Sequence, residues 1–229
     1  MFGQLRGSSF TVAAAEQTFG YPSSPFPGIR LRAGGRMLTV AGKIDRVDRS
    51  GEYTRVVDYK TGAFDVSIEP YYTGRKLQLE LYLSASSAGG RAAGAYYFPA
   101  GAPFHAEGEE PYRMQGFTLG EDEVIRMNDS AVEEGQKSRF IDAYYRGRKT
   151  KNCLPPEQFS DFLEYATLVS ENCVRETDAG CIAPSPYEGA CVYCPYGALC
   201  GYDPADGARS EKKVTAEEVA GIVRRRRGE

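Results

Sequence analysis

The sequence has no tryptophan and only one histidine, His105, among its 229 residues. A single histidine makes histidine-based hydrolytic catalysis an unfavoured hypothesis. No run approaches the ~18 consecutive apolar residues that a membrane helix needs, and the N-terminus lacks the apolar stretch of a secretory signal. We therefore expect a soluble, cytoplasmic protein that does not bind a membrane.

The chain also lacks an excess of basic residues, since its net charge is −3 and its pI is near 5.5. This balance argues against a purely electrostatic nucleic-acid binder, although an enzyme that holds metal ions with carboxylates could carry such a charge. The one basic run, Arg224 to Arg227, is expected to be a solvated tail. A hydrophobic content of 41% is enough for an ordinary core, and the length indicates one domain with at most a small appendage.

Cysteine is missing from the first two thirds of the chain, and all six cysteines follow residue 152. Without a secretory signal, this crowding favours metal or cluster ligation over disulfides. Cys191, Cys194 and Cys200 have Cys-x₂-Cys-x₅-Cys spacing, one ligand short of the usual four. Zinc is compatible with the spacing, and reduced cysteines in a loop are the alternative. Cys173 lies on the apolar side of a predicted helix, where we expect a core position.

The hydrophobic pattern predicts a mixed α/β domain with a helix packed on a sheet. Strands are expected at 10–18, 28–33, 37–48, 53–60 and 92–98, and helices at 71–87, 121–146 and 155–178. Residues 49–52 are a hairpin turn signal. The expected division is a core at 1–118, a helical extension with the cysteine-rich segment at 119–204, and a polar, flexible tail at 205–229.

The densest group of chemically active residues lies on the two strands of that hairpin. Asp58 and Lys60 are two residues apart, so they project from the same face of a strand. Asp45, on the partner strand, can lie beside Asp58. Two adjacent carboxylates repel each other unless a cation lies between them, and Mg²⁺ is the natural occupant. Lys60 would then contact an attacking water or a phosphate.

The alternative is that these charges form ordinary surface ion pairs, which are common on hairpins. Against this, Ile44, Val56 and Val57 indicate inner strands, where charged groups are costly unless they are paired or bind a ligand. The residues alone leave both hypotheses open.

Three segments together resemble the RecB-type branch of the PD-(D/E)XK nucleases. These are Gly-Lys-Ile-Asp-Arg-Val-Asp at 42–48, Val-Val-Asp-Tyr-Lys-Thr-Gly at 56–62, and the Gln-x₃-Tyr pattern of residues 78–82. The resemblance implies a restriction-endonuclease-like mixed sheet flanked by helices, with a C-terminal helical and cysteine-rich segment.

The resemblance also implies roles for individual residues. Asp45, Asp58 and the backbone carbonyl of Tyr59 would bind Mg²⁺ (or Mn²⁺), and Lys60 would be catalytic. Gln78 and Tyr82 would lie on a helix beside the active site and the DNA strand. Glu16, before Gln-Thr-Phe, resembles the acidic residue of the family's preceding strand and would be a further metal ligand.

The cysteine-rich segment resembles the C-terminal end of the B subunits of bacterial AddAB helicase–nucleases. The resemblance implies a [4Fe–4S] cluster held by Cys191, Cys194, Cys200 and a fourth cysteine from an upstream region. It further implies a nuclease domain excised from a longer protein, an AddA-like helicase–nuclease partner subunit, and exonuclease action on DNA in double-strand-break repair and recombination.

Two other hypotheses remain. A stand-alone RecB-like nuclease of CRISPR adaptation shares both motif groups, but it is expected to carry its first cysteine in the same short chain. A non-catalytic DNA-binding or assembly module would retain the fold alone, and such a module has no use for the charges of Asp45, Asp58 and Lys60.

Overall fold

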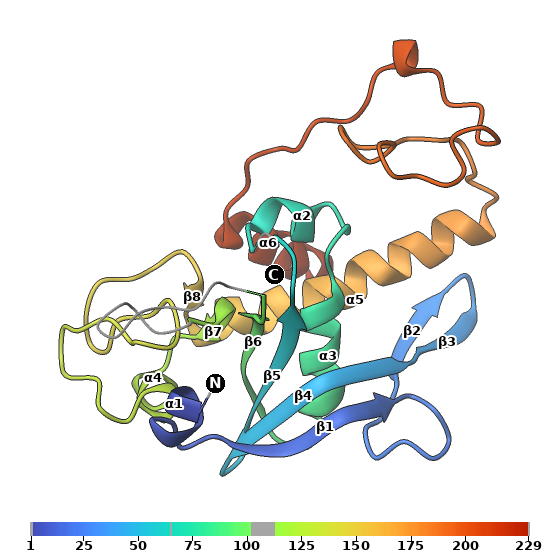
Figure 1. The fold of residues 1–229 in the computed structure, drawn as a ribbon. Helices are drawn as coiled ribbons and strands as arrows, with labels where there is room; N and C mark the ends of the chain where they lie inside the picture. Colours follow the sequence, from blue (N-terminus) through green and yellow to red (C-terminus); the bar gives the residue numbers. More distant parts are fainter. Residues whose placement is uncertain (1, 65, 102–112, 229) are drawn as a thin grey trace.

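A computed structural model of the chain describes residues 2–64, 66–101 and 113–228, and its centre is a six-stranded mixed sheet (Figure 1). His105 lies outside the described residues. The strand order is β1-β4-β5-β6-β7-β8. The bounds are β1 Thr11–Phe19, β4 Gly42–Ser50, β5 Tyr53–Lys60, β6 Arg91–Pro99, β7 Gln115–Leu119 and β8 Cys153–Leu154.

Helices cover one face of this sheet, with α3 (Gln78–Ser86) and α5 (Pro156–Asp178) lying across it (Figure 1). Strand β4 is antiparallel to β1 and β5, whereas β5 and β6 are parallel, so α2 (Ile68–Tyr72) and α3 form the crossover that joins them. The short helix α1 (Phe2–Arg6) precedes the first strand. The expected mixed sheet flanked by helices is confirmed.

The central strands are buried on both faces. Val56 packs into the core under α3 and α5, while its neighbour Val57 packs into a second core on the opposite face of the sheet. The second core contains Met114 and Ile141, which come from the segments before β7 and after α4. Because successive side chains of a strand alternate between faces, the paired valines place β5 in the interior of the sheet.

Three expectations for secondary structure were wrong. The helix expected at 71–87 is broken, because residues 73–77 separate α2 from α3. The strand expected at 37–48 is two strands, β3 (Arg36–Val40) and β4, and β3 pairs with β2 (Ile29–Ala33) in a separate hairpin. The helix expected at 121–146 ends early, because only α4 (Asp122–Asn128) is helical. Asp129 accepts hydrogen bonds from the backbone and side chain of Arg139, which fold the following chain into a compact loop instead of a helix.

The segment expected to be a flexible tail contains α6 (Ala216–Arg227), which packs along α5. Thr215 and Glu218 form a capping box at its start, and Val219 and Val223 are buried. The basic run is not a solvated tail either, because Arg224 and Arg227 form ion pairs with Asp161 of α5. The hydrophobic and acidic partners of this segment are supplied by a helix distant in sequence.

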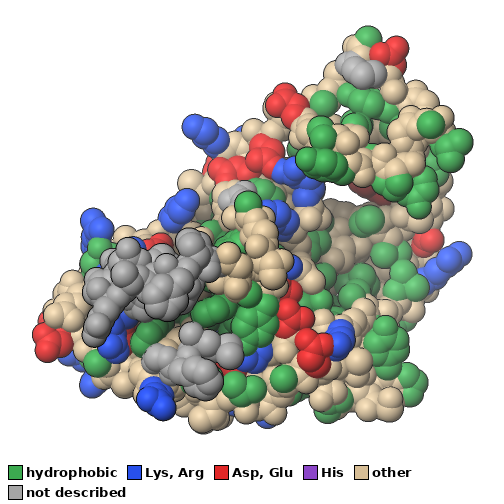
Figure 2. All heavy atoms as spheres, viewed as in Figure 1, with side chains coloured by type: hydrophobic (Ala, Val, Ile, Leu, Met, Phe, Trp, Pro, Cys, Tyr) green, Lys and Arg blue, Asp and Glu red, His purple; other side chains and the backbone are tan. Residues whose placement is uncertain are grey.

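The cysteine-rich segment, residues 180–204, projects from the end of α5 as a lobe with little regular structure beyond the short 3₁₀ turn η1 (Pro204–Asp206) (Figure 1). Hydrophobic side chains are prominent on this lobe in Figure 2, and Ile182, Tyr193 and Leu199 are among the most exposed. Cys173 is exposed on the outer part of α5, so its expected core position was wrong. Within the described ranges, no helix is both long and apolar enough to cross a membrane.

Candidate active site

Asp58 and Lys60 end the central strand β5 and face the helix-covered side of the sheet. The Nζ of Lys60 lies 2.6 Å from Oδ2 of Asp58, and Asp58 is buried. The contact is a close ion pair without the angles of a hydrogen bond, so this buried oxygen has no hydrogen-bond partner among the described residues. Burial raises the pKa of Asp58, and the opposing effect of Lys60 does not cancel that shift.

Asp45 reaches the same place from the neighbouring strand β4. Its Oδ2 accepts a hydrogen bond of 3.1 Å from the backbone amide of Tyr59, the residue between Asp58 and Lys60. Its negative charge also contributes to the raised pKa of Asp58. The two carboxylates therefore converge at the end of β5, as the strand spacing predicted.

A buried charge network holds this end of β5 from the opposite face. Arg46 donates a hydrogen bond of 2.8 Å to the hydroxyl of Tyr59 and contacts Asp48, also at 2.8 Å. Asp48 binds a second buried arginine, Arg55, at 2.9 Å. Sequence reasoning missed this network, although the period of two would have placed Arg46 and Asp48 on one face.

The aromatic ring of Tyr97 lies beside Lys60. Tyr97 of β6 pairs with Asp58 in the parallel register, and its ring centroid is 5.1 Å from the Lys60 ammonium. Burial raises the pKa of Tyr97, with further contributions from the charges of Glu80, Asp58 and Tyr82. The sequence pattern places Tyr97 in the strand expected at 92–98, and nothing local marks its position next to a lysine.

The two residues expected to share a face of α3 do so. The side-chain amide of Gln78 donates a hydrogen bond of 2.9 Å to the hydroxyl of Tyr82. The ring of Tyr82 packs edge-on against Phe19 at a centroid distance of 5.7 Å. Glu80, between them in sequence, is buried, and burial raises its pKa to about 8. The helix therefore turns Glu80 toward Tyr97, with which it lines a small cavity, and leaves Gln78 exposed.

Glu16 is not brought to the two aspartates. It lies on β1 with a φ of 52° and forms an ion pair with Lys43 of β4. Within the described part of the chain, no three His, Cys, Asp or Glu side chains are grouped to hold a metal ion. The structure therefore offers Asp45 and Asp58 as the acidic pair and leaves Glu16 outside it.

The three cysteines that are close in sequence lie in the lobe, far along the chain from this acidic pair. Cys191, Cys194 and Cys200 are all exposed free thiols. The backbone amide of Cys194 donates to the carbonyl of Cys191, so a tight turn joins the first two. Three thiols fit a soft metal or cluster by donor type, but the described residues neither gather them into one group nor add a fourth ligand.

The chain is similar in sequence to proteins named as B subunits of ATP-dependent helicase/deoxyribonucleases. The chain is 30% identical over 255 residues to a protein of Desulforudis audaxviator that is named as the B subunit of an ATP-dependent helicase/deoxyribonuclease, covering 96% of this chain and 22% of that protein. A protein of the same name from Symbiobacterium thermophilum is 32% identical over 248 residues, covering 92% of this chain and 21% of the relative. The chain thus spans about a fifth of the length of these curated relatives.

A sequence profile matches almost all of the chain that carries the site. The profile is that of the PD-(D/E)XK nuclease superfamily, and it covers residues 3–201. This range includes the sheet, the converging pair of Asp45 and Asp58, Lys60, and the helix that bears Gln78 and Tyr82. The chain therefore belongs to the PD-(D/E)XK nuclease superfamily.

Proposed function

We propose that this chain is the metal-dependent deoxyribonuclease domain of a helicase–nuclease and hydrolyses phosphodiester bonds of DNA as an exonuclease. The observation that carries the proposal is the convergence of Asp45 and Asp58 beside Lys60, with Oδ2 of Asp58 buried and without a hydrogen-bond partner among the described residues. Two carboxylates that converge beside a single lysine leave negative charge that a bound cation would offset.

The oxygen atoms of this site fit a hard divalent cation. Asp45, Asp58 and the backbone carbonyl of Tyr59 would hold Mg²⁺ (or Mn²⁺), which prefers carboxylate, carbonyl and water oxygens. When bound, such an ion supplies positive charge that polarises a water molecule and the scissile phosphate. Glu16 would join these ligands only if β1 were to release its ion pair with Lys43.

The chain's own residues do the remaining work. The Lys60 ammonium, about one third exposed, can leave Asp58 and donate a hydrogen bond to a phosphate oxygen or to the attacking water. The ring of Tyr97 lies against the ammonium, with its centroid 5.1 Å from Nζ. Gln78 and Tyr82 offer an amide and a phenol to the DNA strand beside the acidic pair.

The wider assembly follows from the names of the relatives, which are given as B subunits of ATP-dependent helicase/deoxyribonucleases. We infer an AddA-like helicase–nuclease partner and a role in double-strand-break repair and recombination. The projecting lobe is the proposed site of a [4Fe–4S] cluster, with a fourth ligand from outside this chain. Iron and sulfide analysis of the longer protein, with Cys194→Ser as the variant, would test the cluster.

Degradation of linear single-stranded DNA with Mg²⁺ or Mn²⁺ tests the nuclease. The variant is Asp58→Asn, and the matched control is Asp206→Asn, which makes the same change at an exposed position next to the lobe. We expect metal-dependent degradation that is lost in Asp58→Asn and kept in the control. Equal degradation by all three proteins would overturn the proposal.

An inactive isolated domain would still be informative. Mn²⁺ binding, measured calorimetrically on the same proteins, then decides. Loss of the Mn²⁺ site in Asp58→Asn alone supports a catalytic centre that needs the rest of the protein. Absence of a carboxylate-dependent Mn²⁺ site would favour the non-catalytic module.

A further inference from the structure

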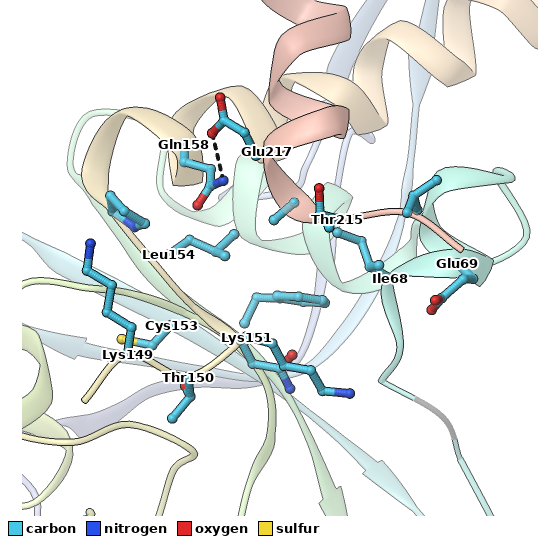
Figure 3. A pocket seen from close by; sticks show the side chains of 15 residues that line it. Ile68, Glu69, Lys149, Thr150, Lys151, Cys153, Leu154, Gln158, Thr215 and Glu217 are labelled. Atoms are coloured by element: carbon cyan, nitrogen blue, oxygen red, sulfur yellow. Dashed lines mark hydrogen bonds between the residues drawn. The ribbon is translucent and has the colours of Figure 1, made fainter. Parts of the chain in front are cut away.

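A cavity of about 560 Å³ lies between the edge of the sheet and the starts of α5 and α6, outside the acidic site (Figure 3). Three stretches distant in sequence line it: residues 68–69, 149–155 with Gln158, and 214–217, together with Phe117 of β7. Its volume is in the range of small-molecule sites, ~300–1,000 Å³. Its floor is apolar and includes Phe117, Ile68 and Leu154.

One buried polar group in this cavity lacks a partner. Asn152 is only 6% exposed, yet its side-chain amide forms no hydrogen bond with any residue the structure describes. Its backbone carbonyl is fixed by the amide of Thr118, which anchors the residue at the sheet edge. A side-chain amide offers one acceptor and two donor hydrogens to whatever enters the cavity. Asn152 is therefore matched to a ligand that has both a donor and an acceptor on one edge.

Positive charge lies at the rim. Lys149 and Lys151 are exposed and form no ion pair with any described residue. Figure 3 shows Lys149 at the left and Lys151 at the lower centre, with their side chains pointing in different directions. Two carboxylates also line the cavity: Glu217, which is held by Gln158 at 3.0 Å and by Arg224 at 2.7 Å, and Glu69. The two lysines are thus available for an anionic group at the mouth.

The cavity lies close to the acidic site. Phe117 pairs with Ala95 of β6, and Tyr97 is two residues farther along the same face of that strand. Diagonal neighbours of this kind are ~7–8 Å apart. Tyr97 is the residue whose ring lies against the Lys60 ammonium. A chain of aromatic side chains therefore leads from Lys60 to the cavity.

We propose that this cavity binds one unstacked nucleotide of the DNA strand, with its base against Phe117 and Ile68, its edge on the amide of Asn152 and its phosphate at Lys149 and Lys151. A nucleotide combines the flat apolar body, the donor and acceptor edge and the anion that this lining requires. The assignment rests on the proposed nuclease function for its choice of ligand, but the binding itself needs no metal.

The test is a titration of the ¹⁵N-labelled protein in EDTA with thymidine 5′-monophosphate, thymidine and inorganic phosphate, followed by ¹H–¹⁵N spectra. The side-chain amide signal of Asn152 is identified by its absence in Asn152→Asp. We expect a saturable shift of this signal with the nucleotide, a weaker response to thymidine, and little response to phosphate. An unmoved Asn152 signal, or equal responses to phosphate and nucleotide, would overturn the proposal.

A charge-reversal pair separates the site from general electrostatics. Lys149→Glu with Lys151→Glu should weaken nucleotide binding by about tenfold or more. The matched control is Arg6→Glu with Arg49→Glu, because both arginines are exposed, lack ion pairs with described residues and lie away from the cavity. Equal weakening by the two pairs would contradict a specific site. Because the titration contains EDTA and follows Asn152, it can fail while DNA cleavage succeeds, and the reverse also holds.

Discussion

The ammonium of Lys60 occupies the oxygen of Asp58 that the proposed cation would need, at a distance of 2.6 Å. Lys60 and the cation therefore compete for Oδ2, and binding of the ion would release the lysine toward substrate. Asp45 does not have this competitor, because its Oδ2 accepts from the Tyr59 amide. The proposed role of Lys60 in cleavage therefore requires that this ion pair open when the cation binds.

Lys60→Met should separate metal binding from cleavage. Methionine keeps the length of the side chain and removes its charge, so Mn²⁺ binding should be at least as tight as in the wild type. Cleavage should fall by roughly 10²–10⁴-fold, the range for loss of a positioned proton donor. Calorimetric Mn²⁺ titration and single-strand degradation rates measure the two effects. A fall in Mn²⁺ affinity as large as that of Asp58→Asn would show that the lysine organises the metal site instead.

Glu80→Gln should change how stability depends on pH. The pKa of Glu80 in the fold is about 8 because of burial, whereas the unfolded value is near 4.5. A folded pKa above the unfolded one gives stability that is complete below pH 4.5 and is lost as the pH rises through about 8. Glutamine cannot ionise and escapes this loss, which amounts to about 1.4 kcal/mol per pH unit between the two values.

Melting temperatures of both proteins at several pH values check this expectation. The variant and the wild type should be similar near the lower pKa, and the variant should gain a growing advantage up to the higher one. A constant difference across this range would mean that Glu80 ionises normally, through a cavity water or a rearranged partner.

Asp48→Ala should destabilise the fold far more than a neighbouring surface change. Asp48 lies between Arg46 and Arg55, and all three side chains are almost fully buried. Removing the anion leaves two buried cations without their partner, which costs ~3–5 kcal/mol in unfolding free energy. Glu52→Ala, which removes an exposed acid from the adjacent turn, should cost at most ~1 kcal/mol. Urea unfolding gives both values, and similar midpoints for the two variants would contradict the network's role.

Val223→Asp should detach α6 from α5. Val223 is fully buried in that contact, and a carboxylate there would be desolvated without a partner. We expect a loss of several kcal/mol in unfolding free energy, or a chain that is cleaved by protease within residues 205–229. Arg225→Asp places the same side chain on the exposed face of the helix and should leave the protease pattern unchanged. Equal proteolysis of the two variants would mean that α6 is not held by this face.

Local patterns were enough to predict that Asp45, Asp58 and Lys60 converge. The period of two on a strand placed Asp58 with Lys60, and the hairpin placed Asp45 opposite them. The Gln78 and Tyr82 contact followed equally from helical spacing. Each of these relations involves residues close in sequence or on paired strands, where geometry leaves little choice.

The parts that sequence reasoning missed depend on partners far along the chain. The sequence of the basic run of α6 predicts a solvated segment, because it does not reveal that Asp161 of α5 lies beside it. The loop after α4 departs from its helical pattern because Asp129 binds Arg139. The cavity around Asn152 is assembled from three separate stretches, so no single motif could reveal it. In these three cases, contacts between residues distant in sequence override the structure that the local sequence favours.

The contact between α5 and α6 has a mechanical consequence for the cysteine lobe. Gln158, near the start of α5, binds Glu217 at the start of α6, while Glu171, farther along α5, binds Arg226. The two helices thus run side by side in the same direction, and the segment between them must return along the length of α5, about 34 Å for its 23 residues. The two ends of the segment that contains the lobe are therefore held at opposite ends of α5. A ligand or a neighbouring protein that displaces the thiols of the lobe would therefore act on α5 at two places. One is the end of α5, and the other is the contact between α6 and the start of α5.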